Sequence, residues 1–458
     1  MKGYNLWSYH PYKPLLRKMG DIYICRIVPS ENTIHIEWLD MGGEEYGIYC
    51  RKRNADDFEK VGKTQSLKFE ISNLETDTDY EFYVEAKGEK SNIRLARTGK
   101  SVGVVVNYLH PDDEMYSYSG RYLCSPSIVR HPDGFLLSSM DIYAKGYPQN
   151  LTLIFRSDDN GASWHYVSEL MPCFWGKMFI HKNELYMISC STEYGDLLIG
   201  KSNDGGKTFG APVCLLRGSN GKNGNDGVHK NPQNVFIHNG RIYNTLEWGT
   251  WANKEYCHAA MVMSCSVDED LLVPENWSFS EPKVFNPNDA PELAELPNCT
   301  MTIEGTLVLD KTVGLLNIMR FGGDREVIAY KVNIHNFDAP LEYSHCISFP
   351  ANLSKFTIKY DDVSKKYYSI ASRLTENSKA TRNVLSLMAA DDLKNWFLVT
   401  DLLDYSMYDS QKIGFQYVDF EIEGEDIIFV CRTAMNNAHN YHDSNYQTFH
   451  RIRKFRYI

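Results

Sequence analysis

A short motif that recurs along the chain constrains its fold more than any other feature. The segments 157–164 (SDDNGASW) and 202–209 (SNDGGKTF) share the form Ser-x-Asp-x-Gly-x-Ser/Thr-aromatic, and weaker copies occur at 266–277 and 389–396. In such a turn, Asp and Ser hydrogen-bond the backbone, Gly takes a positive φ, and the aromatic residue fills space between adjacent sheets. Four spaced copies therefore predict a repeated β-sheet unit.

Each copy follows an apolar segment that reads as an outward-running strand. These segments are Thr152–Arg156, Asp196–Lys201, Ala260–Ser264 and Val384–Met388, and we expect each to be the third strand of a four-stranded propeller blade. Gly, Asp and Asn turns recur after residue 100, with hardly any helical period. We predict an all-β fold in which residues 100–458 form a β-propeller of six blades, with five or seven as the alternatives. Residues 449–458 are expected to close the ring against a strand near residue 105.

The segment before the propeller has a different pattern. After an N-terminal extension, 1–20, residues 21–98 read as short alternating strands of a β-sandwich. Trp38 supplies a core aromatic residue, and Tyr80 follows a polar turn, where its hydroxyl is placed to cap the corner. Residues 21–98 therefore resemble a fibronectin type III domain. We expect it to be a spacer or packing module rather than a catalytic or sugar-binding one.

Composition excludes several classes of function. The net charge of −11 does not favour nucleic acid, although a local cationic pocket can still hold a single carboxylate. No segment approaches the roughly 18 unbroken apolar residues that cross a bilayer, so no membrane partner is expected. The eleven cysteines form no CxxC pair, which argues against a structural zinc site or a disulfide framework. Aromatic residues reach 13%, which fits half-buried strands and also surfaces that stack on sugars.

The repeated motif matches the Asp box (BNR repeat), and the chain after residue 100 resembles the sialidase superfamily. In that family three arginines grip the substrate carboxylate, a Glu activates a nucleophilic Tyr, and an Asp is the general acid and base. The resemblance implies that Glu304 is the activating carboxylate and that Arg320, sixteen residues later, binds the substrate carboxylate. Arg382, just before the last repeat, is the second candidate arginine.

The sequence departs from this family pattern at two positions. Cys124 stands where the first blade of a sialidase has an arginine, and Arg121 is a nearby substitute. Phe415 aligns with the nucleophilic tyrosine, whereas Tyr417 lies on the same side of the expected strand and serves only if the register differs by two residues. Asp419 follows on the same strand. Ordinary retaining sialidase chemistry therefore depends on the local register.

Other polar and aromatic groups add candidates. His229 has the chemistry of an acid or base near neutral pH, and Glu247 with Trp248 offers a carboxylate beside a stacking ring. Near the C-terminus, Arg432 and His439 are further candidates; the HxxH spacing there favours hydrogen-bonded turns over a metal site. Runs around His229, Arg382 and Gln416 resemble a bacterial group of sialidase-like proteins, which implies a bacterial origin and adds Gln416 to the substrate-binding candidates. Residues 1–20 lack the apolar core of a signal peptide, which predicts a cytoplasmic protein if Met1 is the native start.

These observations give one leading hypothesis and two alternatives. The first is an exo-acting glycoside hydrolase that removes an acidic terminal sugar of the sialic or uronic type and needs no cofactor or metal. Its nucleophilic pair would be Glu304 with Tyr417, or its acid and base would be Glu304 with Asp419 or His229. Arginines 320 and 382, joined by Arg432 or Arg121, would hold the sugar. The alternatives are a polysaccharide lyase acting on uronate-containing glycans and a non-catalytic carbohydrate-binding propeller. The oligomeric state is left open.

Overall fold

The computed structural model describes Trp7 and residues 22–39, 42–220, 223–253, 257–293, 302–321, 326–351, 354–375 and 381–458. The predicted N-terminal extension lies outside the described residues except for Trp7. The described part is all-β, as predicted, with strands β1 to β33 and four short 3-10 turns: η1 (Pro274–Asn276), η2 (Pro287–Asp289), η3 (Pro291–Leu293) and η4 (Phe455–Tyr457). Among these described residues, no helix is long and apolar enough to cross a membrane.

The N-terminal strands form two facing sheets. One contains β1 (Ile24–Pro29), β2 (Ile34–Trp38) and β5 (Lys68–Ile71), and the other contains β4 (Glu59–Thr64), β3 (Tyr46–Lys52), β6 (Asp79–Ala86), β7 (Glu89–Lys90) and β8 (Arg94–Arg97). Alternate residues point inward, so that Trp38 and Tyr46 meet in the core with ring centroids 5.2 Å apart. The Tyr80 hydroxyl accepts a hydrogen bond from the Glu75 amide at 2.9 Å, which confirms the predicted corner.

Six further sheets follow, which we number in chain order. Sheet 1 contains β10 (Tyr122–Arg130), β11 (Leu136–Tyr143), β12 (Leu151–Ser157) and β13 (His165–Leu170); sheet 2 contains β14 (Phe174–His181), β15 (Glu184–Cys190), β16 (Leu197–Ser202) and β17 (Val213–Leu216). Sheet 3 contains β18 (Gly227–His229), β19 (Phe236–His238), β20 (Arg241–Gly249), β21 (His258–Ser266) and β22 (Trp277–Phe279).

Sheets 4 to 6 repeat the four-stranded plan. Sheet 4 contains β23 (Thr302–Asp310), β24 (Gly314–Phe321), β25 (Glu326–Lys331) and β26 (Glu342–Ser348); sheet 5 contains β27 (Ile358–Asp361), β28 (Lys366–Ser372), β29 (Val384–Ala390) and β30 (Trp396–Asp404). Sheet 6 contains β31 (Gly414–Glu423), β32 (Asp426–Ala434), β33 (Tyr446–Ile452) and β9 (Val104–Tyr108).

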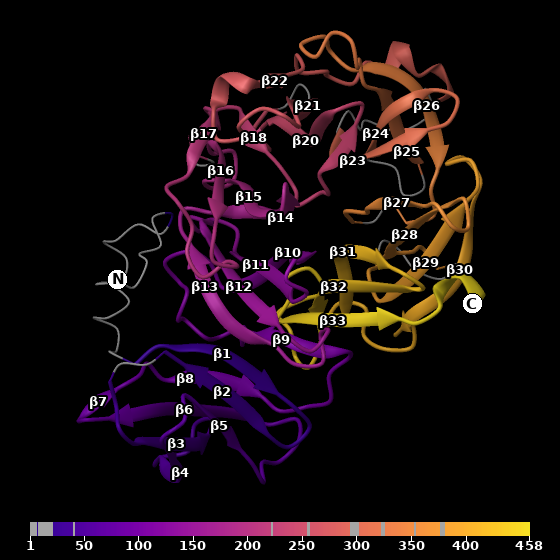
Figure 1. The fold of residues 1–458 in the computed structure, drawn as a ribbon. Helices are drawn as coiled ribbons and strands as arrows, with labels where there is room; N and C mark the ends of the chain where they lie inside the picture. Colours follow the sequence, from indigo (N-terminus) through magenta and orange to yellow (C-terminus); the bar gives the residue numbers. More distant parts are fainter. Residues whose placement is uncertain are drawn as a thin grey trace.

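Figure 1 shows these six sheets arranged in a ring, with the two N-terminal sheets beside sheets 1 and 6. The C-terminal strand β33 pairs with β9, with Tyr446 opposite Tyr108 and Phe449 opposite Val104. The predicted closure against a strand near residue 105 is confirmed, but the closing strand is Tyr446–Ile452 rather than residues 449–458. The strands predicted before each repeat are also confirmed as the third in their sheets, namely β12, β16, β21 and β29.

The repeated turns are stabilised by their own side chains. Asp159 accepts hydrogen bonds from the Ser157 hydroxyl (2.8 Å) and from the amide and hydroxyl of Ser163 (2.8 and 2.6 Å). Asp204 makes the equivalent bonds in sheet 2. The fourth copy differs, because Asp392 rather than Asp391 accepts the turn amides. That copy lacks the serine and glycine that set the turn in the first two.

The N-terminal sheets are docked through buried polar contacts. Arg94 of β8 pairs with Asp113, which follows β9, at 2.7 Å, and both side chains are almost fully buried. Arg26 of β1 donates to the carbonyl oxygen of Val106 in β9 at 2.7 Å. Trp7 is also buried, and its indole donates to the Pro172 carbonyl at 2.7 Å. The small unit thus packs directly on the ring.

Candidate active site

Backbone irregularities in the first strand of several sheets position the candidate site. The antiparallel register shifts in β10, β14, β23 and β31: near the start of each strand, two of its residues lie opposite a single residue of the partner strand. Three residues at these bulges, Trp175, Glu304 and Tyr417, have positive φ values of 54°, 59° and 55°. A bulge bends the strand and re-aims a side chain, and left-handed backbone at residues other than glycine is typical of functional sites.

The bulged side chains line one cavity of about 710 Å³, to which all six sheets contribute. Cys124, Trp175, Glu304 and Tyr417 reach it from the bulges. The remaining lining residues come from adjacent strands and loops: Tyr143, Lys145, Gly146, Gln149, Glu193, Tyr194, Gly224, His229, Thr250, Trp251, Ala252, Ile303, Arg320, Arg382, Arg432 and His442. A cavity with converging polar groups and a few rings is the usual form of a small-molecule site.

Tyr417 and Glu304 are directly joined in this cavity. The Tyr417 hydroxyl donates to Glu304 Oε1 at 2.6 Å, and Arg320 Nη1 donates to Glu304 Oε2 at 2.9 Å. Burial alone would favour the neutral carboxyl, but the Arg320 charge and these hydrogen bonds hold the pKa of Glu304 below its ordinary value. Burial and the neighbouring Glu304 raise the pKa of Tyr417. The pair is thus a phenol bonded to an ionised carboxylate that is placed to accept its proton.

Arg432 occupies the space beside Cys124. It comes from β32 of sheet 6, is 1% exposed, and its Nη1 lies 3.4 Å from Cys124 Sγ. Its Nη2 donates to the His442 carbonyl oxygen. The guanidinium also lies 5.0 Å from the centroid of the Tyr417 ring. The small side chain of Cys124 leaves room for this arginine at the cavity wall.

Arg382 completes a group of three arginines around Tyr417. Its Nη1 donates to Gln416 Oε1, and Gln416 is fixed in turn by a 2.6 Å bond from its Nε2 to the Tyr441 carbonyl oxygen. Burial, together with repulsion from Arg320 and Arg432, lowers the pKa of Arg382 to about 10. Three like charges crowded in one cavity favour an anionic ligand, because it relieves their mutual repulsion.

Sheets 1 to 3 supply the other side of the cavity. His229 Nδ1 lies 2.6 Å from Glu247 Oε2, which orients the imidazole. The ring packs on Trp175 with centroids 4.3 Å apart and on His258 at 4.7 Å. Glu247 Oε1 also accepts from the Gly305 amide at 3.3 Å. Glu247 therefore fixes both His229 and the bulge that carries Glu304.

A charged cluster lies behind the cavity wall. Asp419 is fully buried and pairs with Lys177 Nζ at 2.5 Å, while Lys355 Nζ donates to the Val418 carbonyl oxygen at 3.0 Å. Burial lowers the pKa of Lys355 and of Lys230 to about 8. Asp419 also accepts from the Ile128 amide at 2.8 Å and so ties sheet 6 to sheet 1.

Sequence reasoning named several residues that lie elsewhere. Asp419 is in the cluster just described. Arg121 lies 3.8 Å from Glu114, His439 pairs with Asp443 at 2.8 Å, and Trp248 is partly buried on β20; these three are not among the residues lining the cavity. The predicted residues that do line it are Glu304, Tyr417, His229, Arg320, Arg382 and Arg432. Gln416 and Glu247 hold members of that set in place.

Several lining residues were not predicted. Trp175 follows Phe174 in an apolar run that gave no sign of a bulge, and Glu193 and Tyr194 lie in an ordinary polar turn. The sequence holds one signal for Glu193, namely its position. It falls in the connection between a strand and the segment predicted to be the third strand of its sheet.

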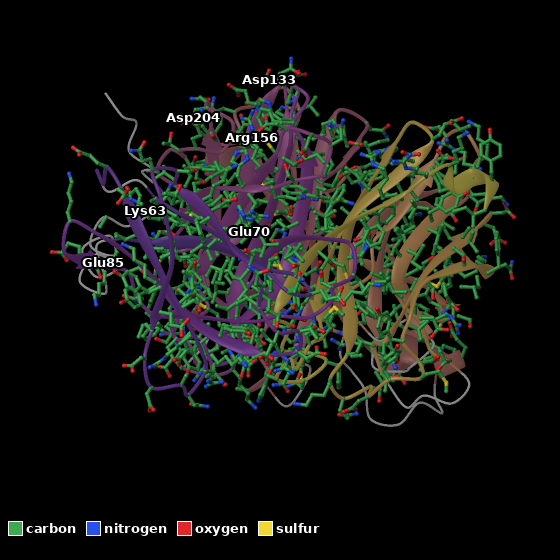
Figure 2. All side chains as sticks on the ribbon, turned by 90° about the horizontal axis from the view of Figure 1, so that it is seen from below. Lys63, Glu70, Glu85, Asp133, Arg156 and Asp204 are labelled. Atoms are coloured by element: carbon green, nitrogen blue, oxygen red, sulfur yellow. The ribbon has the colours of Figure 1, made fainter. Side chains whose placement is uncertain are left out.

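A second cavity, of about 770 Å³, lies between repeated turns of sheets 1 and 2. Figure 2 shows three of its residues, Asp133, Arg156 and Asp204, close together at the edge of the molecule. Arg156 stacks on Phe135 and pairs with Asp158, so the polar groups satisfy one another. The first cavity is the better candidate site, because carboxylate, phenol, imidazole and guanidinium groups converge there. Within the described residues, no group of three or more His, Cys, Asp or Glu has the arrangement of a metal site.

Comparison with known proteins gives only remote similarities. No protein-family model and no curated protein matches the chain. Among solved structures, an α-L-arabinanase from Penicillium chrysogenum has 14% identity and a TM-score of 0.48, covering 77% of this chain and 97% of that one. A leech intramolecular trans-sialidase has 10% identity and a TM-score of 0.47, and the match covers 92% of this chain and 83% of that one. An ulvan lyase of a polysaccharide lyase family has 11% identity and a TM-score of 0.42, and the match covers 94% of this chain and 91% of that one. Similarities of this size assign neither fold nor activity.

Proposed function

We propose that the chain is a glycoside hydrolase in which residues 21–98 form a fibronectin type III-like domain and residues 100–458 a six-bladed, sialidase-like propeller. Its substrate is an acidic sugar, of the sialic or uronic type, at the end of a glycan. One observation carries the proposal: Tyr417 and Glu304 are bonded at 2.6 Å in a cavity that also holds three arginines. The arginines suit a carboxylate, and the pair suits nucleophilic attack.

The chemistry follows from the charges in the cavity. Arg320, Arg382 and Arg432 bind the sugar carboxylate. The Tyr417 oxygen attacks the anomeric carbon while its proton moves to Glu304, and the bond to the leaving oxygen breaks as that oxygen takes a proton from a general acid. Water then displaces Tyr417 from the anomeric carbon while the deprotonated general acid takes a proton from that water, and Glu304 returns its proton to the phenol oxygen. Configuration is retained because two displacements occur.

A lyase is the second candidate, and the His229–Glu247 pair favours it. A uronate lyase needs a cation to neutralise the carboxylate and a base to remove the adjacent proton. An imidazole oriented by a carboxylate at 2.6 Å, in the same cavity as three arginines, supplies both. The product would be an unsaturated uronate, which absorbs ultraviolet light.

The test is an assay of the purified full chain against sialosides, aryl uronides, neutral glycosides and uronate oligosaccharides. Reducing-sugar release and ultraviolet absorbance are followed together. We expect release of an acidic sugar without new absorbance, lost at least about a hundredfold in Tyr417→Phe and Glu304→Gln. Tyr360→Phe, on β27 and outside the cavity lining, is the matched control. New absorbance identifies a lyase instead, and binding without turnover identifies a carbohydrate-binding protein.

A further inference from the structure

Glu193 faces the cavity from the side opposite the arginines. It lies in the turn between β15 and β16 of sheet 2, whereas Arg320, Arg382 and Arg432 come from sheets 4, 5 and 6. The six sheets follow one another around the ring, so sheet 2 lies across from sheet 5 (Figure 1). A sugar held by its carboxylate against the arginines therefore presents its other side to Glu193.

The turn that carries Glu193 is held on several sides. The Ser191 amide donates to the Asp196 carbonyl oxygen at 2.8 Å, and the Asp196 amide donates to the Ser191 hydroxyl at 2.9 Å. Tyr194 has a positive φ of 59°, and a Cβ at Gly227 would lie 1.9 Å from its carbonyl oxygen. These contacts hold the backbone of the turn in one place, and a catalytic group requires such a fixed support.

The carboxyl group of Glu193 is also in a distinctive environment. Gln149 Nε2 donates to its Oε2 at 3.3 Å, and the Trp251 side chain donates a second hydrogen bond. Burial nevertheless raises the pKa of Glu193 above its ordinary value, whereas the pKa of Glu304 is lowered. Two carboxyl groups whose environments push their pKa values apart divide naturally into an acid and a base.

We propose that Glu193 is the general acid and base of the hydrolysis, an inference that rests on the proposed function. In the first displacement the Glu193 proton passes to the glycosidic oxygen as its bond to the anomeric carbon breaks and the bond to the Tyr417 oxygen forms. In the second, the Glu193 carboxylate takes a proton from water. The water oxygen then bonds to the anomeric carbon, the bond to Tyr417 breaks, and Glu304 returns its proton to Tyr417.

Three other titratable groups that line the cavity suit this role less well. Burial and the nearby Arg432 charge lower the pKa of His442 to about 4, so its imidazole is neutral near pH 7 and is a poor proton donor. Burial raises the pKa of Tyr143 to about 12, which makes it a weak acid. His229 directs Nδ1 to Glu247 and lies between Trp175 and His258.

The test compares leaving groups in the Glu193→Gln variant of the full chain. The probes are the 4-nitrophenyl and methyl glycosides of N-acetylneuraminic acid and of glucuronic acid. Nitrophenolate leaves without taking a proton, whereas the methoxy group must take a proton in order to leave as methanol. We therefore expect kcat/KM to fall at least about a hundredfold for the methyl glycosides and less than about tenfold for the nitrophenyl glycosides. Azide, which needs no base, should restore turnover of the nitrophenyl glycoside and give a glycosyl azide.

Glu184→Gln is the matched control, because Glu184 lies at the opposite end of β15 and is not among the residues that line the first cavity. The Glu184→Gln variant should leave kcat/KM unchanged for both the nitrophenyl and the methyl glycosides. If kcat/KM falls equally for both leaving groups, or if azide does not restore turnover, the role of Glu193 is overturned. The hydrolase itself is still supported in that case if the wild type is active and the Tyr417→Phe variant is inactive. A wild type that hydrolyses none of the four glycosides overturns both proposals.

Discussion

Arg432 provides the cationic wall of the cavity next to Cys124, although it comes from a different sheet. A thiol occupies far less volume than an arginine side chain, and Arg432 extends across from β32 until its Nη1 lies 3.4 Å from Cys124 Sγ. The bond from its Nη2 to the His442 carbonyl oxygen fixes the plane of the guanidinium. A planar fork held in one orientation suits a carboxylate better than a mobile ammonium group does.

Arg432→Lys therefore tests the carboxylate-binding role at the scale of one residue. Lysine keeps the charge but cannot reproduce the fork, so we expect KM for an acidic-sugar substrate to rise about tenfold or more, with a smaller change in kcat. Steady-state kinetics on the wild-type substrate measure this. Arg121→Lys is the control, because Arg121 lies outside the cavity lining. The opposite result, a raised KM for Arg121→Lys alone, would return the role to Arg121.

At the scale of strands, the bulges separate what the sequence predicts from what it does not. The repeated turns were predictable because their hydrogen bonds lie within seven residues, as those of Asp159 do. Strict alternation places Phe415 and Tyr417 on the same face of the strand, so the pattern alone does not decide which of them faces the cavity. The bulge breaks that alternation: Phe415 enters the core and Tyr417 the cavity. The bulged Tyr417 bonds Glu304 of sheet 4, a partner that no local pattern encodes.

The bulge in β23 gives a prediction at this scale. Gly305 follows Glu304, and a Cβ at Gly305 would lie 2.2 Å from Asn317 Oδ1, a buried group on β24. Gly305→Ala should displace Asn317 or the bulge. We expect a loss of about 1–3 kcal/mol in the free energy of unfolding and at least about a tenfold fall in kcat, because a small shift of Glu304 misplaces its contact with Tyr417.

Gly210→Ala is the matched control for that change, since a Cβ there meets only the Lys201 carbonyl oxygen, at 3.8 Å. Both variants are compared by urea denaturation and by kcat. If Gly305→Ala retains full activity, the bulge does not hold Glu304 in the way its geometry implies.

On the scale of the whole molecule, the small N-terminal unit and the ring share a buried ion pair. Arg94 and Asp113 are 3% and 0% exposed, and Arg94 also donates to the Ile24 carbonyl oxygen at 2.6 Å. A second pair between the same parts, Arg53 with Asp112, is 2.6 Å long but 31% and 53% exposed. Two adjacent aspartates thus form one buried and one solvent-exposed ion pair between the same two parts.

This difference predicts how tightly the two parts are joined. Arg94→Met removes the partner of a fully buried carboxylate, so we expect a loss of about 3–5 kcal/mol in the free energy of unfolding. Arg53→Met, the matched control, should cost about 1 kcal/mol or less, because water solvates Asp112. Urea denaturation followed by tryptophan fluorescence measures both. Similar small losses in the two variants would mean that the N-terminal unit separates readily from the ring and that Asp113 reaches water.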